Sequence, residues 1–202
     1  MPFLDESREE MLRHIKPGGV GAEVGVQVGY YAGILLRRAK PRKLLLIDLW
    51  EHQDADVYVD DANFEQERHD EFYQRALKRH AAAIEAGTVE IRKGYSCDEL
   101  AKIPDNFLDW IYIDANHSYE GVLADLKEAY RVVKPTGLIM GHDYADWWEK
   151  GSKCGVIPAV TSFLNAHREL ALMAITKVTE NDWNPSYIIG PKGTTFPPQE
   201  SD

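Results

Sequence analysis

Short apolar, β-branched segments alternate with helical patterns along most of this 202-residue chain. This alternation constrains the fold more than any other feature. The predicted strands cover residues 20–26, 43–49, 88–92, 108–114, 137–141, 171–178 and 186–189. The predicted helices between them cover residues 30–39, 61–86, 96–102, 119–133 and 157–167. Strands separated by helices form parallel sheets, whereas the last two strands have no helix between them. We therefore expect an α/β fold: a Rossmann-like, doubly wound, seven-stranded sheet, mostly parallel with an antiparallel closing strand.

The domain organisation follows from the length, which favours a single domain over residues 1–202. Within it we expect an amino-terminal helix and loop at residues 1–19. The helix is predicted over residues 5–16, with Met11, Leu12 and Ile15 on its apolar side, and Pro17 ends it. Residues 192–202 are expected to form a tail.

Charge and composition restrict the classes of partner. The chain has 33 acidic and 23 basic residues, a formal charge of −10, and a binder of phosphate backbones needs a basic face instead. No signal-peptide pattern or apolar run of about 20 residues appears, so we expect a cytoplasmic protein without membrane contact. Cys97 and Cys154 are expected to be ordinary thiols. A small-molecule partner fits best, and homo-oligomerisation remains open.

The segment AEVGVQVGYYAG, at the end of the first predicted strand, contains the first candidate ligand-binding residues. In doubly wound sheets, ligands bind beyond the carboxyl ends of the strands. Gly25 and Gly29 bracket a tight turn that would bring a ligand to a helix N-terminus. Their spacing departs from the Gly-x-Gly-x-x-Gly of dinucleotide-binding dehydrogenases. Glu23 is an acid inside an apolar strand, where it needs a cation or hydrogen-bond donors, and a salt bridge would serve equally.

The next two strand ends carry weaker signals. Asp48 ends the second strand, where an acid can accept hydrogen bonds from both ribose hydroxyls of a nucleoside. Ser96 follows the third strand, and it either caps the next helix or contacts a nucleobase.

The fourth and fifth strand ends are the most informative. IYIDANHSYE places Asp114 at a strand end with His117 three residues further on, and LIMGHDY places His142 and Asp143 at the neighbouring strand end. Two carboxylates and two imidazoles at adjacent strand ends suit a divalent metal ion. They also suit a general base, because imidazole titrates near neutral pH.

At this point the sequence resembles the class I S-adenosylmethionine (SAM)-dependent methyltransferases, in particular the small-molecule O-methyltransferases of the catechol and macrolide-sugar types. The resemblance extends from Val20 to Ile189. AEVGVQVGYYAG resembles the glycine-rich motif of this family, and FLDWIYIDANHSYEGVLADL and KPTGLIMGHDY resemble its later motifs. The resemblance implies a cofactor site in which Glu23, Gly25 and Gly29 surround the methionine and ribose. It also implies that Asp48 holds the ribose hydroxyls and that Ser96 lies near the adenine.

The resemblance also implies roles in the reaction. Asp114 would bind near the methyl donor and a metal ion, and His142 and Asp143 occupy the positions of the other metal ligands. His117 stands where these enzymes keep a base, and would take the proton from the acceptor hydroxyl. The metal-dependent members usually have an oxygen ligand where this chain has His142. Imidazole is a poor ligand for Mg²⁺, so either the metal is a transition ion, or His142 is not a ligand and no metal is needed. Mg²⁺ is kept as an alternative to a transition metal.

Several alternatives stay open. A nicotinamide-dependent oxidoreductase, or a non-enzymatic nucleoside-binding protein, is compatible with the same sheet. We expect the acceptor pocket in the least patterned segments, whose aromatic residues suit a ring or serve equally as a packing surface: Tyr58, Tyr144, Trp147, Trp148 and Trp183. Residues 51–71 contain nine acids and one base, either as a solvated helix face or as an acidic lid favouring a neutral or cationic acceptor.

Overall fold

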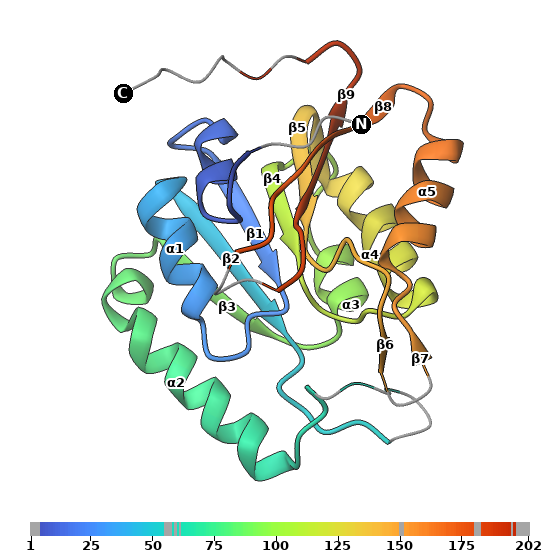
Figure 1. The fold of residues 1–202 in the computed structure, drawn as a ribbon. Coiled ribbons are helices and arrows are strands. Elements are labelled where there is room, and N and C mark those ends of the chain that lie inside the picture. The colour runs from blue at the N-terminus through green and yellow to red at the C-terminus, as the bar shows by residue number, and fades with distance from the viewer. Residues whose placement is uncertain are drawn as a thin grey trace.

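Seven strands form a central sheet in the computed structural model, which describes residues 5–54, 58, 60, 62–149, 152–179, 183–194 and 196 (Figure 1). The order across the sheet is β3-β2-β1-β4-β5-β9-β8. The strands are β1 (Val20–Val24), β2 (Lys43–Asp48), β3 (Val89–Lys93), β4 (Leu108–Ile113), β5 (Val133–Gly141), β8 (Leu170–Ile175) and β9 (Tyr187–Pro191). The first five are parallel to one another, and β9 is antiparallel to both β5 and β8. This arrangement confirms the predicted fold class.

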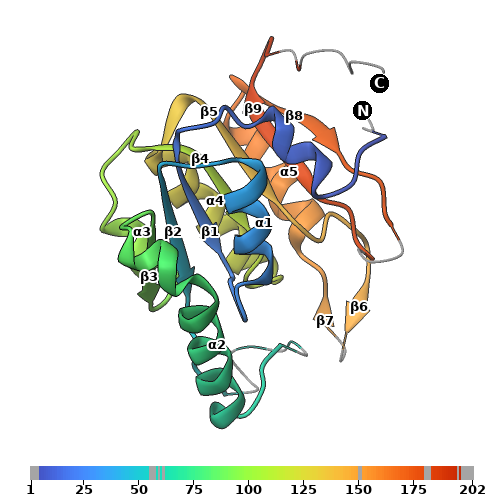
Figure 2. The same cartoon turned by 90° about the vertical axis from the view of Figure 1, so that its left-hand side faces the viewer.

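Helices cover both faces of the sheet (Figures 1 and 2). On one face lie a short 3-10 helix (Glu10–His14), α1 (Tyr30–Arg38) and α2 (Gln66–Glu85). On the other lie α3 (Ser96–Ala101), α4 (Tyr119–Val132) and α5 (Val156–Ala166). Each helix buries an apolar stripe, such as Phe72 and Ala76 of α2 or Leu126 and Ala129 of α4. Two apolar cores therefore enclose the sheet, and all five residues of β1 are buried.

The strand register aligns the carboxyl ends of the four central strands. Val24 of β1 pairs with Ile47 of β2 and with Ile113 of β4, and Ile113 pairs in turn with Gly141 of β5. The residues that follow these strands are consequently neighbours at one edge of the sheet, as expected for parallel strands.

The predicted amino-terminal α-helix over residues 5–16 is wrong, because only Glu10–His14 is helical there, as a 3-10 turn. Glu6 makes contacts that a helix would not allow it to keep. Its backbone carbonyl accepts the N–H of Lys177, and its carboxylate pairs with Arg13 and His14. These contacts hold the first residues away from a helical path. The apolar side was correctly identified, since Met11, Leu12 and Ile15 are all buried.

Other boundaries differ in ways that have local causes. The strand predicted at residues 137–141 is β5, which already begins at Val133. The register between β4 and β5 shifts between Leu108 and Trp110, and this irregularity accommodates Pro135 within the strand. The long helix begins at Gln66 rather than at residue 61. A two-stranded hairpin of β6 (Trp148–Glu149) and β7 (Ser152–Lys153) was not predicted. Of the expected tail, residues 192–194 and 196 are described.

The helices of the described residues include none with the length and apolar character needed to cross a bilayer.

Candidate functional site

A cavity of about 500 Å³ lies at the carboxyl ends of the central strands. Six of the nine predicted site residues line it: Glu23, Gly25, Asp48, Ser96, Asp114 and His117. Gly29, His142 and Asp143 are not among the lining residues that the structure describes. The strand-end residues expected around a nucleoside cofactor are therefore gathered around one cavity.

Gly25 permits the closest backbone approach in the cavity wall. Its φ angle is +86°, and a Cβ atom there would lie 1.8 Å from the carbonyl oxygen of Asp114. No other residue type fits between the ends of β1 and β4, so this glycine shapes the cavity floor.

Gly29 has a structural role, and its predicted contact with the cofactor stays a prediction. It adopts φ +71° at the start of α1, and its carbonyl accepts a hydrogen bond from His80 of α2 at 2.8 Å. A Cβ atom at Gly29 would lie 2.7 Å from the Nε2 atom of His80. The conformation and the packing between α1 and α2 require this glycine, and a cofactor contact is not needed to explain it.

Asp48 organises the turn between β1 and α1. Its Oδ2 atom accepts the N–H groups of Val26 and Gln27, each at 2.7 Å, and its Oδ1 atom accepts the N–H of Trp50 at 3.0 Å. A carboxylate can accept about four hydrogen bonds, so room for one further donor remains. Ribose binding by Asp48 stays a prediction, and holding the turn is a role that sequence reasoning missed.

Glu23 is a buried acid whose side chain is part of the cavity wall. The residue is only 1% exposed, and burial raises the pKa of its carboxyl well above the usual value, although the Arg8 charge opposes this. Among the described residues, no hydrogen-bond partner reaches its Oε2 atom. Such an oxygen is suited to accept a hydrogen bond from a cationic ligand group.

At the α3 end of the cavity, Ser96 is the first residue of the helix, and the prediction that it caps the helix is wrong, because Tyr95 is at the N-cap position and no side chain of the described residues makes a capping bond there. Asp125 of α4 is an unpredicted residue of the same wall. Asp125 is 1% exposed, and the Cys97 thiol donates to its Oδ1 atom at 3.7 Å. Burial raises the pKa of Asp125 to about 6, although hydrogen bonds from Ser96 and Cys97 lower it. Asp125 lies on the buried side of α4 with Val122 and Leu126, so an acid in an apolar stripe, the signal that identified Glu23, could have identified it.

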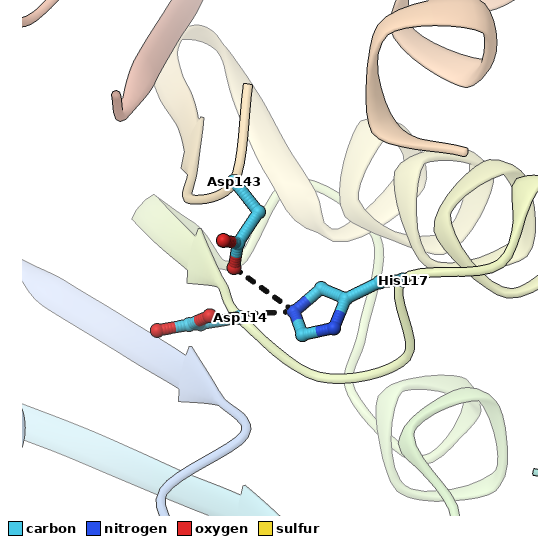
Figure 3. A group of neighbouring side chains, drawn as sticks. All are labelled: Asp114, His117 and Asp143. Carbon is cyan, nitrogen blue, oxygen red and sulfur yellow. Dashed lines mark ion pairs between the residues drawn. The ribbon is translucent and has the colours of Figure 1, made fainter. Parts of the chain in front are cut away.

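His117 stands among the carboxylates of Asp60, Asp114 and Asp143, and Figure 3 shows it with the last two. Its Nδ1 atom lies 2.7 Å from Asp60 Oδ2, and its Nε2 atom lies 3.0 Å from Asp143 Oδ2 and 3.8 Å from Asp114 Oδ1. Burial lowers the pKa of His117, but Asp114, Asp143 and Asp60 together raise it to about 12. The imidazole is therefore a cation in this arrangement, and a base only when another positive charge offsets the carboxylates.

Asp143 connects both histidines. His142 Nδ1 lies 3.0 Å from Asp143 Oδ2 and 3.7 Å from Asp114 Oδ1, while Asn184 donates to Asp143 Oδ1 at 2.6 Å. Burial would raise the pKa of Asp143, but His117 and His142 lower it. The four predicted residues of the later motifs are thus brought together, with Asn184 as an unpredicted neighbour.

The donor set fits a divalent metal ion. Asp114, His117 and Asp143 each offer one ligand atom, and these atoms lie within 4.8 Å of one another. His117 Nε2 is buried and lacks a partner with hydrogen-bond geometry among the described residues, although Asp143 is near. Two carboxylates with an imidazole suit Mn²⁺, Fe²⁺ or Zn²⁺ better than Mg²⁺. The predicted ligand His142 lies beside the same carboxylates.

The acidic segment 51–71 contributes Asp60 to this cluster. Six of its nine acids are exposed, in keeping with a solvated surface: Glu51, Asp54, Glu65, Glu67, Asp70 and Glu71. Asp60 differs, because it is buried and contacts His117 across 57 positions. Asp56 and Asp61 lie outside the described residues. A count of acids identified the segment but could not show which member reaches the site.

The aromatic residues expected around an acceptor occupy different places. Tyr58 lines the cavity, and the Trp147 ring lies 5.6 Å from the His117 ring. Tyr144 is buried against Tyr187, whereas Trp183 is 85% exposed. The Trp148 side chain lies outside the described part. Packing therefore explains Tyr144, and Tyr58 and Trp147 remain beside the predicted site.

Arg8 of the amino-terminal segment also lines the cavity. Its Nη2 atom lies 2.5 Å from Asp114 Oδ2, and its guanidinium stacks on the rings of Tyr31 and Tyr112 at 3.9 and 5.0 Å. Burial would raise the pKa of Asp114, but the Arg8 charge is the largest of the influences that lower it. No sequence motif pointed to this arginine.

Comparison with known proteins places these features in a family. Residues 22–144 match the family described as "Methyltransferase domain". No protein of curated function matches the sequence significantly. Among solved structures, a SAM-dependent methyltransferase from Aquifex aeolicus is 18% identical, with a TM-score of 0.57 over 87% of this chain and 83% of that one.

Two further structures share the fold. One, provisionally described as an rRNA methylase, from Clostridium thermocellum, is 11% identical, with a TM-score of 0.62 over 91% of this chain and 94% of that one. The other, provisionally described as an O-methyltransferase, from Klebsiella pneumoniae, is 19% identical, with a TM-score of 0.58 over 90% of this chain and 75% of that one. At these identities the likeness concerns the fold.

Proposed function

The chain belongs to the methyltransferase-domain family, and we propose that it transfers the methyl group of SAM to a hydroxyl group of a small molecule. The observation that carries this proposal is the position of His117. It lies at the end of the cavity where β4 and β5 finish, beside Asp114 and Asp143, and Asp60 contacts its other ring nitrogen. The family match favours methyl transfer over nicotinamide chemistry.

The cavity offers groups for each part of the cofactor. In this proposal Asp48 faces the ribose hydroxyls and Ser96 lies near the adenine, while Gly25 lets the ligand approach the backbone. The buried acid Glu23 and the strand-end acid Asp114 are placed for the ammonium and sulfonium end. The cofactor supplies the reactive methyl group, and the protein supplies orientation.

His117 takes the proton of the acceptor. The hydroxyl oxygen attacks the methyl carbon, the carbon–sulfur bond breaks with its electron pair remaining on sulfur, and the hydroxyl proton passes to His117 Nε2. Asp60 holds Nδ1 and so fixes the ring with Nε2 towards the reacting atoms. This step requires a neutral imidazole, and a cation bound at Asp114 and Asp143 would offset the charges that keep it protonated.

We assign the metal ligands of this proposal to Asp114, His142 and Asp143, because this set keeps His117 Nε2 for the proton. A divalent ion bound there would lower the pKa of the acceptor hydroxyl. The rival set has His117 in place of His142, and its ligand atoms all lie within 4.8 Å of one another. The two sets predict opposite roles for His117, as base in the first and as metal ligand in the second. A single Nε2 lone pair cannot bind a metal and accept a proton at the same time.

Acidity around the cavity favours a small acceptor over a nucleic acid. The exposed acids of residues 51–71 follow β2 directly, and Glu51 lines the cavity. A phosphate backbone would meet like charge there. A neutral or cationic small molecule would not.

The experiment that tests the proposal measures S-adenosylhomocysteine formation. The purified protein is incubated with SAM and a panel of phenols, catechols and sugars, with Mg²⁺, Mn²⁺ or Zn²⁺, or with a chelator. His117→Gln is expected to lower turnover by about 10²–10⁴-fold while SAM affinity stays within threefold. The control His167→Gln changes a histidine at the carboxyl end of α5, outside the cavity lining, and should match the wild type.

Four outcomes contradict parts of the proposal. Full turnover by His117→Gln would exclude it as the base, and full turnover with chelator would exclude the metal. Loss of Mn²⁺ or Zn²⁺ binding in His117→Gln, with binding kept in His142→Gln, would establish the rival ligand set. Transfer only to amines would replace the hydroxyl acceptor.

A further inference from the structure

Arg8 is the one arginine or lysine among the described residues that line the cavity. The same lining contains five acids: Glu23, Asp48, Glu51, Asp114 and Asp125. The side chain of Arg8 is only 18% exposed, so its charge acts in a partly desolvated place. The other cation of the lining, His117, is already held among Asp60, Asp114 and Asp143, so Arg8 is the group that would favour an anion on the ligand.

The structure holds Arg8 in a fixed place. Its backbone carbonyl accepts a hydrogen bond from the Tyr31 hydroxyl at 3.1 Å, and its guanidinium lies over the Tyr31 and Tyr112 rings. Stacking of this kind orients the planar guanidinium and is weaker for a lysine ammonium. Lys177 and Glu6 connect the same segment to the end of β8. The side chain is therefore ordered before a ligand arrives.

The charges of SAM match this arrangement. Its sulfonium and ammonium groups are cations, and its methionine carboxylate is its one anion at neutral pH. Glu23 and Asp114 lie on the same side of the cavity as Arg8, as the ion pair of Arg8 with Asp114 and the influence of Arg8 on Glu23 indicate. The ammonium and the carboxylate of SAM are on one carbon. The ammonium would face Glu23 and Asp114, and the carboxylate would face Arg8.

We propose that Arg8 binds the methionine carboxylate of SAM and so selects SAM over its decarboxylated form. The inference rests on the proposed use of SAM in this cavity. A guanidinium has five N–H donors, so Arg8 can bind the ligand carboxylate while it stays beside Asp114. The alternative is that Arg8 serves only as the counter-ion of Glu23 and Asp114. In that case it would not distinguish SAM from decarboxylated SAM.

The test compares SAM with decarboxylated SAM, which lacks only the carboxylate. Binding is measured by calorimetry on the wild type, Arg8→Met and the control Arg13→Met. Arg13 belongs to the same segment but pairs with Glu6 and does not line the cavity. Wild type and Arg13→Met are expected to bind SAM at least tenfold more tightly than decarboxylated SAM. Arg8→Met should lose at least tenfold for SAM and change less than threefold for the decarboxylated ligand.

The outcomes separate this inference from the proposed function. Equal affinities of the wild type for both ligands would overturn the inference even if Arg8→Met did not fold. An equal loss for both ligands in Arg8→Met would leave Arg8 as a counter-ion only and also overturn it. Arg8→Lys, which keeps the charge without the planar fork, should retain part of the discrimination. Binding of neither ligand by the wild type would overturn the proposed function itself.

Discussion

Asp125→Asn is expected to stabilise the unliganded protein, although it alters a residue of the cavity wall. Asp125 is buried on α4, its Oδ2 atom has no partner among the described residues, and its Oδ1 atom has the weak thiol donor of Cys97. Burial raises the pKa of this carboxyl to about 6. Keeping it ionised at neutral pH therefore costs free energy, and an amide of the same shape avoids that cost.

The magnitude follows from the two pKa values. The folded protein binds the Asp125 proton more tightly than the unfolded chain, so this contribution lowers stability as the pH rises through about 4 to 6 and then levels off. Because the ordinary value is 3.8 and the folded value about 6, the full effect is about 3 kcal/mol. About 1.4 kcal/mol of it falls between pH 5 and pH 8.

The assay is urea unfolding of wild type and Asp125→Asn at several pH values between about 5 and 8. The difference in unfolding free energy should grow by about 1.4 kcal/mol in favour of the variant over this range. Glu99→Gln is the matched control, because Glu99 is a buried acid of α3 that pairs with Lys102 at 2.6 Å. Its replacement should lower stability. A pH-independent difference for Asp125→Asn would refute the reasoning.

Three other substitutions test the site. Gly25→Ala should cost more than about 2 kcal/mol of unfolding free energy in urea titrations, because its Cβ would lie 1.8 Å from a backbone oxygen; wild-type stability would refute the close approach. Asp48→Asn should lose about 1–3 kcal/mol, since an amide nitrogen would face backbone N–H groups, and an unchanged midpoint would argue against this role. Asp60→Asn should lower kcat about 10- to 100-fold with KM for SAM unchanged, because His117 loses its orienting partner. An unchanged kcat in steady-state kinetics would mean that Asp60 only packs against His117.

The strand-end residues could be predicted from the sequence because two simple patterns coincide there. Buried strands appear as short apolar runs, and parallel strands bring their carboxyl ends to one edge, so Asp48, Asp114 and Asp143 could be placed without coordinates. The register of β1, β4 and β5 then gathers Asp114 and Asp143 near His117. The prediction succeeded where local pattern and topology determine position.

The residues that the sequence could not supply reach the site through tertiary contacts. Asp60 contacts His117 from a segment without periodicity, and Arg8 contacts Asp114 across 106 positions. Neither differs in type from many exposed neighbours. Gly29 is a related case, because a glycine that a helix start requires looks in sequence like one that a ligand requires, and its cofactor contact stays a prediction. Residue type and spacing alone do not distinguish these cases.

The charge of the cavity gives the chain's acidity a more specific meaning. The exposed acids of residues 51–71 act through solvent and are screened beyond about 8 Å, so they repel phosphate-rich acceptors without fixing any ligand. The acids inside the cavity act in a less polar medium, where Glu23 and Asp114 are stabilised by a cationic partner, whereas Asp48 accepts three backbone N–H groups. Arg8 pairs with Asp114 and so offsets part of this negative charge. A ligand with two positive groups and one carboxylate would offset more of it. The net charge favours a small molecule over a phosphate-rich partner, whereas the placement of Glu23, Asp114 and Arg8 is the reason for proposing that the amino-acid end of SAM binds there.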